Sequence, residues 1–432
     1  MNPSLTRRQF LKNSSAAAAV AGLYAMTPKA RAQSDDSPDI VRVAAIGCGG
    51  RMSTDLKNFI EACTLLGLRA EITALADAFP DQTARTADRF GVPAGRCFFG
   101  FGAYREALKT DAEFVLLATP PNFRPLHLEA ALEADKHVFM EKPVAVDPAG
   151  CRKVIELGGV AERKRLAIVA GTQRRHELNY LQNAARVQAG AIGQILGGAV
   201  YWNGTVPWIY ERQPGWSDAE YLARNWVNFW EMSGDHITEQ HVHNLDVANW
   251  FIGRPPESAL GMGGRARRES GNQYDFFSVD YDYGNGVHIN SQCRQISGCY
   301  DRVGEFFRGT KGEVHGGGRI TGLDVPIPDF KVASENGTVQ EMVDLINSVI
   351  DDQPLNEARQ VAESTATAIM GRLSAYTGEI VRWSDMMLNP ESEFYSIRAL
   401  PAAGDFETGT VILPPENTVA LPGDGEPIRR RG

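Results

Sequence analysis

The sequence predicts an α/β protein with two domains: an N-terminal domain built on a parallel sheet, and a C-terminal α+β domain with a large, mainly antiparallel sheet. Three observations support this prediction. Apolar strand patterns alternate with helical patterns over roughly the first 165 residues, a glycine-rich loop follows the first strand, and closely spaced strand patterns dominate from about residue 195 to 310. A length of 432 residues also exceeds that of one ordinary domain.

The N-terminal domain begins with an apolar run at 40–46, which is broken only by Arg42 and is typical of a parallel strand buried on both faces. Strands are also predicted at 71–76, 114–118 and 138–140, and helices at 53–68, 80–90 and 125–134. Strands that alternate with helices in this way form βαβ units, whose strands lie parallel in one sheet. We assign residues 40–165 to this domain.

The C-terminal domain is assigned to residues 166–385 and opens with a short strand at 166–170. Gly284-Asn285-Gly286 is typical of a hairpin turn between two strands, which indicates antiparallel pairing. Residues 386–432 are rich in Pro, Gly and Glu and are interpreted as an extended arm that either wraps a neighbouring subunit or lacks order. The predicted strands lie at 195–202, 258–264, 276–283, 286–294 and 302–307, and the flanking helices at 234–251 and 340–378.

The N-terminus is predicted to be an export signal rather than a fold element. Thr6-Arg7-Arg8-Gln9-Phe10-Leu11-Lys12 is followed by an apolar run at 16–26 and by Ala30-Arg31-Ala32, the order found in a twin-arginine signal peptide. Cleavage after Ala32 would leave a polar linker at 33–39. We therefore expect a periplasmic protein that folds, and takes up any cofactor, before export.

The net charge of the chain excludes some classes of partner, and the spacing of its cysteines indicates their chemical state. The formal net charge is −9, and the first 32 residues contribute only basic charges, so the remainder is more acidic still. Such a surface repels nucleic acid and anionic lipid, so neither is an expected partner. The six cysteines lack the tight spacings of a small disulfide scaffold, and buried free thiols are expected.

A candidate phosphate-binding loop, Gly47-Cys48-Gly49-Gly50-Arg51-Met52, lies between the first strand and the first helix. Its glycines allow the backbone to approach a pyrophosphate, and the N-terminus of the following helix stabilises the negative charge. The position of the loop at the start of a βαβ series indicates a Rossmann sheet that binds a dinucleotide. Met52 replaces the third glycine of the motif, so helix and strand must pack differently there.

Asp77 ends the second strand and is the candidate acceptor for the hydroxyls of the adenosine ribose. It lies 30 positions after Gly47, where about 20 is usual, because the first helix is long. A carboxylate at this point repels a 2′-phosphate and favours NAD, although Arg51 leaves NADP possible. An ordinary turn aspartate is the alternative interpretation.

Two later strand ends contribute candidates on the same sheet edge. Ala118-Thr119-Pro120-Pro121-Asn122 either lines the nicotinamide ribose or forms a structural turn, and His127 either caps this site or is a core histidine. Glu141-Lys142-Pro143 follows the strand at 138–140. Ligands of open α/β sheets bind beyond the carboxyl ends of the strands, and Pro143 fixes the backbone around Lys142. Lys142 is therefore expected where cofactor and substrate meet.

A second cluster of candidates lies at 234–246, where Glu239, His243 and Asp246 recur at helical spacing. A carboxylate beside an imidazole raises its basicity and fixes its tautomer, which suits a general base near neutral pH. His236, Glu239 and His243 also raise the question of a metal ion. Their spacing is not that of an established zinc motif such as His-Glu-x-x-His, and no metal is expected.

Together these motifs resemble the Gfo/Idh/MocA family of oxidoreductases, which includes inositol dehydrogenases. The resemblance rests on the strand and glycine loop, Ala118-Thr119-Pro120-Pro121, the Glu141-Lys142-Pro143 motif and the later carboxylate–histidine pattern, and it spans roughly residues 41–385. It implies that Lys142 and His243 act on a substrate hydroxyl with Glu239 beside them, and that Glu141 and Lys142 contact the cofactor. Glu239 replaces the usual aspartate, and His241 stands where glycine is common, which indicates an altered, more polar substrate pocket.

A group of aromatic and polar residues between 201 and 230 suits a sugar substrate. Aromatic faces stack on sugar rings, whereas Arg and Asn side chains bond hydroxyls. Two arginines after the strand at 166–170 are expected to point towards the same cleft. Plain core packing is the alternative for any single tryptophan. The candidate substrate residues are Arg174, Arg175, Trp208, Tyr210, Arg224, Asn225 and Trp226.

We therefore expect a periplasmic NAD(P)-dependent oxidoreductase that transfers hydride between a hydroxyl of a sugar, polyol or glycoside and a tightly bound nicotinamide cofactor. Because the periplasm offers no pool of free NAD, a second substrate or an unidentified electron acceptor would reoxidise that cofactor. The wide antiparallel sheet, uncovered by helices on one face, favours a homo-oligomer.

Two alternative functions are considered. One is an NAD-dependent glycosidase that oxidises a sugar transiently and eliminates the aglycone; the resemblance implies that this branch lacks the Glu-Lys-Pro motif, which the present chain keeps. The other is a non-catalytic sugar or nucleotide sensor. A sensor should have lost the lysine or the histidine, and Lys142 and His243 are both present.

Overall fold

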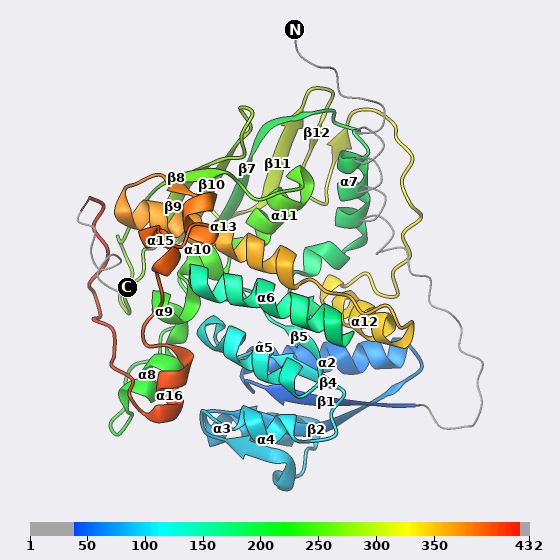
Figure 1. The fold of residues 1–432 in the computed structure, drawn as a ribbon, viewed down its shortest axis with the longest axis vertical. Coiled ribbons are helices and arrows are strands. Elements are labelled where there is room, and N and C mark those ends of the chain that lie inside the picture. Colours follow the sequence, from blue (N-terminus) through cyan, green and yellow to red (C-terminus); the bar gives the residue numbers. More distant parts are fainter. Residues whose placement is uncertain (1–38, 424–432) are drawn as a thin grey trace.

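The computed structural model describes residues 39–423 as two domains built on two sheets (Figure 1). The parallel sheet and its helices form the lower part of the view, and the antiparallel sheet forms the upper part. The predicted twin-arginine signal at 1–32, nearly all of the linker and the last nine residues of the arm lie outside the described residues. The predicted fold class is confirmed.

The first sheet has six strands, every pairing is parallel, and the strand order is β3-β2-β1-β4-β5-β6. The order reverses between β1 and β4, and nucleotides bind at such a switch point in Rossmann folds. All four residues of β4 are buried, as expected for a sheet that helices cover on both faces. The strands are β1 (Ile40–Ile46), β2 (Arg69–Asp77), β3 (Cys97–Phe99), β4 (Phe114–Leu117), β5 (His137–Met140) and β6 (Ile168–Ala170).

Helices from both parts of the chain cover this sheet. Those of the first domain are α2 (Gly50–Leu65), α3 (Pro80–Phe90), α4 (Tyr104–Leu108), α5 (Arg124–Glu133) and α6 (Pro148–Lys164). A later helix, α12 (Gly337–Ile350), packs against α2 (Figure 1), and its apolar face, including Met342 and Ile346, shares a core with Phe59. The second half of the chain therefore completes the first domain.

The second sheet has eight strands in the order β13-β12-β11-β7-β10-β9-β8-β14. All pairings are antiparallel except that of β7 with β10. Burial alternates strictly along the first six residues of β10, because helices cover one face of the sheet and the other face is open. The strands are β7 (Ile195–Gly204), β8 (Ser258–Gly264), β9 (Phe276–Asp282), β10 (His288–Gln295), β11 (Arg302–Gly309), β12 (Glu313–Val314), β13 (Ile320–Thr321) and β14 (Val381–Arg382).

Two helices supply most of the cover on the inner face of this sheet. They are α11 and α13, whose apolar residues, such as Leu245 and Leu373, share a core with Val279 and Ile289 of the strands. The helices of this part of the chain are α7 (Leu178–Gln188), α8 (Asp218–Arg224), α9 (Trp230–Ser233), α10 (His236–Glu239), α11 (Val242–Ile252), α13 (Ala358–Thr377), α14 (Trp383–Met387), α15 (Glu393–Ser396) and α16 (Ala403–Thr408).

Three predicted boundaries need correction. The strand at 166–170 is β6 of the parallel sheet, so the first domain reaches about residue 170 rather than 165. The helix expected at 340–378 is two helices: α12 packs on the first domain, whereas α13 packs on both domains, against α6 and against the second sheet. The helix expected at 234–251 is likewise interrupted between α10 and α11.

The predicted C-terminal arm folds back on its own chain over its described part, residues 386–423. Glu407 of α16 accepts a hydrogen bond from the Tyr104 hydroxyl at 3.0 Å and pairs with Arg105, both in α4 of the first domain. Phe406 packs between Phe101 and Phe123 of the same domain. In Figure 1 the arm descends from the second domain and places α16 beside α8. It therefore connects the two domains of one chain.

Two features of composition are also settled within residues 39–423. All six cysteines are free, and four of them are buried, whereas Cys97 is partly exposed and Cys299 is exposed. No described helix combines the length and the apolar character needed to cross a membrane.

Candidate active site

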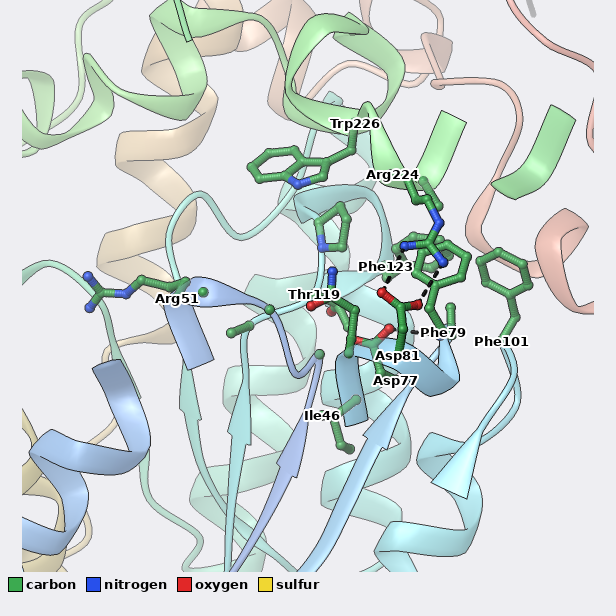
Figure 2. Close-up of a pocket in the computed structure, with 18 of the residues that line it drawn as sticks. Ile46, Arg51, Asp77, Phe79, Asp81, Phe101, Thr119, Phe123, Arg224 and Trp226 are labelled. Atoms are coloured by element: carbon green, nitrogen blue, oxygen red, sulfur yellow. Dashed lines mark hydrogen bonds and ion pairs between the residues drawn. The ribbon is translucent and has the colours of Figure 1, made fainter. Parts of the chain in front are cut away.

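A pocket of about 840 Å³ lies at the carboxyl edge of the parallel sheet (Figure 2). Its floor is formed by the segments that follow β1, β2 and β4, and its opposite wall by residues 208–226 of the second domain. A volume of this size lies within the range of small-molecule and cofactor sites, which is about 300–1,000 Å³.

The glycine loop has the shape that a pyrophosphate requires. Gly47 has φ +91°, and a Cβ there would lie 2.6 Å from the backbone nitrogen of Thr119, so only glycine allows this close passage. Gly49 and Gly50 line the pocket, and a Cβ at either would meet no atom within 4 Å. This open space at the N-terminus of α2 fits an anionic diphosphate, which the backbone N–H groups would bind.

Asp77 lines the pocket with an orientation fixed by the backbone. Its Oδ2 accepts from Cys48 N at 2.7 Å and its Oδ1 from Phe79 N at 2.9 Å. Burial raises the pKa of Asp77 to about 6, against the lowering effect of these two donors. The carboxylate keeps further lone pairs, so its position fits the predicted contact with ribose hydroxyls.

Thr119, Pro120 and His127 also line the pocket, as predicted for cofactor-binding residues. The Thr119 hydroxyl lies 3.1 Å from His127 Nδ1, and the His127 ring stacks on Phe123. Burial lowers the pKa of His127 to about 3, so its imidazole is neutral near pH 7. His127 thus combines the two interpretations of the sequence: it is a buried histidine, and it borders the site.

Five predicted cofactor residues do not line the pocket, namely Cys48, Met52, Asn122, Glu141 and Lys142. The Asn122 amide donates to the carbonyls of Glu231 and Pro401, at 2.8 and 3.1 Å, and so ties the first domain to the second. Met52 is fully buried in the core beneath α2, which is how the helix packs without the third glycine. The Cys48 thiol is buried as well, and this residue acts through its backbone N–H.

Arg51 and Glu141 connect the glycine loop to the lysine motif. Arg51 lines the pocket, and its guanidinium bonds Glu141 Oε1 at 2.6 Å and Asp55 Oδ1 at 2.8 Å. Glu141 Oε2 accepts from Lys142 N at 3.1 Å. Glu141 is buried and does not line the pocket, so it positions its neighbours instead of contacting the cofactor as predicted.

Lys142, Glu239 and His243, the three predicted catalytic residues, come together between the domains. Lys142 Nζ donates to the Glu239 carbonyl at 2.5 Å and lies 3.3 Å from Glu239 Oε1. The His243 ring stacks on Trp202, with centroids 5.8 Å apart. Burial, followed by the nearby charge of Lys142, holds the pKa of His243 well below its ordinary value. The site thus contains an ammonium beside a neutral imidazole.

The carboxylate partners differ from those predicted. Glu239 ends α10 and His243 lies in α11, so they do not share the face of one helix, and the Glu239 carboxylate pairs with Lys142. Asp246 bonds Arg175 through both oxygens, at 2.8 and 2.9 Å, and also accepts from the Ser364 hydroxyl. Glu239 therefore positions the lysine, whereas the expectation was that it orients the histidine.

The other histidines of this segment are structural. His241 Nε2 lies 2.7 Å from the Ser291 hydroxyl of β10, and burial lowers the pKa of His241 to about 3. His236 Nδ1 pairs with Asp235 Oδ1 at 3.1 Å. Over residues 39–423, no cluster of three or more His, Cys, Asp or Glu side chains has an arrangement that could hold a metal ion.

The candidate substrate residues divide into two groups. Trp208, Tyr210, Arg224 and Trp226 line the pocket. They lie on the wall opposite the floor formed by the segments after β1, β2 and β4, which we call the nucleotide floor, and Arg224 bonds Asp81 of α3 at 2.8 Å (Figure 2). The remaining three do not line this pocket, and each is engaged with protein groups. They are Arg174, paired with Glu305 at 2.7 Å, Arg175, paired with Asp246, and Asn225, whose amide donates to Ser270.

Sequence reasoning missed several residues of the pocket, notably Phe79, Asp81 and Phe101. Phe79 and Asp81 follow Asp77 directly and flank the start of α3, so the same strand end that revealed Asp77 could have indicated them. Phe101 carries no such signal, because it follows the short edge strand β3, which the sequence pattern did not reveal.

Two family models match the chain. One is described as the oxidoreductase family with an NAD-binding Rossmann fold and covers residues 41–170. The other is described as the Gfo/Idh/MocA C-terminal domain and covers residues 180–315. Both belong to the same family, and together they cover more than half of the chain.

Curated relatives match in part. Inositol 2-dehydrogenase 3 of Saccharopolyspora erythraea is 32% identical over 216 residues, which is 49% of this chain and 54% of the relative. A glycosyl hydrolase family 109 protein of Shewanella pealeana is 26% identical over 254 residues, 56% of this chain and 54% of the relative. The chain spans about half the length of the curated relatives it matches.

Solved structures show the same fold. GenD2 from gentamicin A biosynthesis, solved in complex with NAD, has a TM-score of 0.62 at 16% identity and covers 82% of this chain and 99% of its own. The WlbA dehydrogenase from Bordetella pertussis, solved with NADH and UDP-GlcNAcA, has a TM-score of 0.62 at 21% identity, with coverage of 79% and 98%. With the two family models, these findings place the chain in the Gfo/Idh/MocA family of oxidoreductases, and its first domain is the NAD-binding Rossmann domain of that family.

Proposed function

We propose that this protein is an NAD-dependent dehydrogenase that oxidises a hydroxyl of a sugar, polyol or glycoside. The observation that carries the proposal is the convergence of Lys142, Glu239 and His243 beside a Rossmann nucleotide pocket. A neutral imidazole can remove a proton from an alcohol, and a fixed ammonium stabilises the negative charge that develops on the oxygen. The curated relative named inositol 2-dehydrogenase supports a polyhydroxylated substrate.

In the proposed reaction His243 accepts the hydroxyl proton. Its imidazole is neutral at physiological pH, because burial and the charge of Lys142 disfavour the protonated form. Lys142 is held by the carbonyl and the carboxylate of Glu239, and its charge stabilises the negative charge that grows on the substrate oxygen as the proton leaves. The nicotinamide cofactor, when bound, supplies the acceptor for the hydride of the carbinol carbon.

The position of Asp77 supports NAD as the preferred cofactor over NADP, since a 2′-phosphate there would face a carboxylate fixed by two backbone donors. The twin-arginine pattern before residue 32 supports export to the periplasm. In that compartment the cofactor would have to remain bound between turnovers. We therefore propose that a second substrate or an electron acceptor reoxidises the cofactor while it is bound to the protein.

A homo-oligomer is also part of the proposal. The uncovered face of the eight-stranded sheet exposes large apolar side chains on β8 and β9, including Leu260, Met262 and Phe276, the second of which is 73% exposed. Apolar side chains gathered on an open sheet face are typical of an interface, and a second copy of this chain would bury them. Light scattering coupled to gel filtration measures the mass directly, and a monomer at micromolar concentration would contradict this part.

A second candidate is a glycosidase that oxidises its substrate transiently and eliminates the aglycone. The observation in its favour is the 26% identical relative named as a glycosyl hydrolase family 109 protein. The two candidates differ in their products: the dehydrogenase passes electrons to an acceptor, whereas the glycosidase releases an aglycone with no net change of redox state.

The deciding experiment has two steps. First, absorbance and mass spectrometry of the purified protein should reveal a bound nicotinamide nucleotide. Second, a panel of sugars, polyols and glycosides is assayed with an artificial electron acceptor and for aglycone release. Lys142→Ala and His243→Ala should abolish turnover and keep the nucleotide. Absence of any nucleotide affinity, or full activity in both variants, would overturn the proposal.

A further inference from the structure

The wall of the pocket that faces the nucleotide floor is a segment without regular structure. Residues 205–217 contain no helix or strand, and together with α8 and Trp226 we call residues 205–226 the aromatic cover. Irregular connections of this length inside a compact domain are uncommon and are usually functional. The cover belongs to the second domain but lies across the pocket of the first (Figure 2).

The cover presents aromatic side chains to the pocket. Trp208 packs on Tyr210 and Trp226, with ring centroids 5.0 and 6.1 Å apart, and all three line the pocket. Trp208 and Tyr210 are nevertheless 46% and 49% exposed. Large aromatic surface that lines a cavity is available to be buried by a planar ligand group, and a nicotinamide dinucleotide carries two such groups.

The side-chain amides of two buried asparagines hold the backbone of the cover in place. Asn225 Oδ1 accepts from Tyr210 N at 3.0 Å, and Asn228 Nδ2 donates to the Trp208 carbonyl at 3.1 Å. Both asparagines are fully buried, and Asn228 Nδ2 also donates to Asn225 Oδ1 at 2.9 Å. The aromatic side chains are therefore presented by a preorganised backbone, which lowers the entropic cost of ligand binding.

Arg224 attaches the cover to the first domain. Its guanidinium bonds Asp81 Oδ1 at 2.8 Å and Glu220 Oε1 at 3.0 Å, and lies 3.9 Å from the centre of the Phe79 ring (Figure 2). The hydrogen bond from Arg224 is the main reason why the pKa of Asp81 lies below its ordinary value. Asp81 and Phe79 follow the end of β2, where the adenosine half of a dinucleotide lies in Rossmann folds.

The C-terminal arm supports the same face. Phe406 of α16 shares a hydrophobic cluster with Tyr221 and Leu222 of α8 and with Phe123 of the first domain. Opening the cover would therefore require breaking the Arg224–Asp81 bond and disturbing this cluster.

From this geometry we propose that the aromatic cover retains the nucleotide on the protein and that Arg224 is its latch: while Arg224 holds Asp81, the adenosine half cannot leave the pocket. The inference rests on the proposed use of a nicotinamide dinucleotide and deepens it. It gives a structural basis for a cofactor that stays bound from one turnover to the next. Arg224 is a positioning residue in this role, because it acts on the cover and on Asp81.

The test measures the release of NADH from the full-length protein after mixing with excess NAD, followed by nicotinamide fluorescence, and needs no substrate. Arg224→Met keeps the aliphatic stem and removes the charge, and should release NADH about tenfold faster or more, the effect expected for losing a hydrogen bond between charged groups. Asp81→Asn should act in the same direction, and the double variant should be no faster than the faster single one.

The matched control is Arg308→Met, which removes an exposed arginine–glutamate pair far from the pocket, Arg308 to Glu313 at 3.0 Å, and should leave the release rate unchanged. If Arg224→Met does not fold, Trp208→Ala carries the test, because this half-exposed side chain can be removed without opening a core cavity. An unchanged rate of NADH release in these variants, or an equally faster release in the Arg308→Met control, would overturn this inference and leave the proposed function intact. A wild-type protein that binds no NADH would overturn the proposed function itself.

Discussion

Lys142 and Glu239 form a double contact across the two domains: the lysine Nζ donates to the Glu239 carbonyl at 2.5 Å and lies 3.3 Å from its carboxylate. Lys142 follows β5 of the parallel sheet, and Glu239 ends α10 of the second domain. Both side chains are about one-tenth exposed. The ammonium is thus held by an acceptor that mutation cannot remove, the carbonyl, and by one that it can, the carboxylate.

The first prediction tests how the charge of Lys142, as distinct from the size of its side chain, contributes to turnover. Lys142→Met keeps the stem and removes the ammonium, so kcat should fall roughly a hundredfold or more, since the growing charge on the substrate oxygen loses its partner. NADH affinity should remain close to that of the wild type, because Lys142 does not line the pocket. Glu239→Gln keeps the carbonyl contact and should lose less activity than Lys142→Met.

Steady-state kinetics and NADH titration check these variants against Lys153→Met, which removes a partly exposed lysine bonded to Glu129 at 2.6 Å. The control should keep full activity. Thermal unfolding of the same variants is measured as well, because Lys142→Met leaves the buried Glu239 carboxylate without its ion pair and should lower the stability of the protein. Wild-type kcat in a folded Lys142→Met protein would remove the lysine from the mechanism.

The second prediction concerns the pH dependence of turnover. His243 must be neutral to accept a proton, and its pKa is held well below 6.5 by burial and by Lys142. As the pH falls, kcat/KM should therefore stay level through pH 6.5 and decline only at lower pH, as His243 becomes protonated. A pH–rate profile of the wild type, with buffers of constant ionic strength, measures this limb. A decline centred at or above pH 6.5 would exclude His243 as the base.

The parallel sheet was predictable from the sequence because its signals are local. β1 and α3 begin and end at the predicted residues, since a continuous apolar run specifies a buried parallel strand and a proline at the first helical position specifies the start of α3. The alternating burial of β9 and β10 is equally local, with the turn Gly284-Asn285-Gly286 between them in positive φ.

The partners of Glu239 were not predictable, because they depend on contacts across the fold. The helix that would have aligned Glu239 with His243 is interrupted at Gln240, and Lys142, 97 positions away, takes the carboxylate. The aromatic residues at 208–226 illustrate the same limit. Their composition suits a sugar, but the buried Asn225 and Asn228 direct their backbone over the nucleotide floor.

The third prediction links a buried histidine to stability. His241 has a pKa of about 3 in the folded protein, and the ordinary value for an unfolded chain is about 6.5. Between these values the unfolded state binds more protons, so the stability that the neutral histidine confers is complete above pH 6.5 and is lost as the pH falls. The loss approaches about 1.4 kcal/mol for each pH unit below 6.5.

Urea unfolding at pH 7 and at pH 5 measures this loss. His241→Gln retains a side chain that can bond the Ser291 hydroxyl and cannot be protonated, so its stability should fall less between the two pH values than that of the wild type. His288→Gln, which changes an exposed histidine of the open sheet face, is the control and should keep the wild-type difference. Equal losses in wild type and His241→Gln would contradict the assignment.

The last prediction tests the nucleotide floor. Asp77 accepts from Cys48 N and Phe79 N with its two oxygens, and an asparagine can replace only one of these acceptors and would direct its NH₂ group at the other donor. Asp77→Asn should therefore loosen the turn after β2, lose a ribose acceptor and weaken NADH binding by about tenfold or more. The discrimination against NADPH should fall at the same time, because the charge that repels a 2′-phosphate is gone.

Calorimetric titration with NADH and NADPH gives both affinities, and Asp88→Asn, on the exposed side of α3, should change neither. Unaltered affinity for both nucleotides in Asp77→Asn would show that this carboxylate only shapes the turn, and that selectivity for the cofactor arises elsewhere in the pocket.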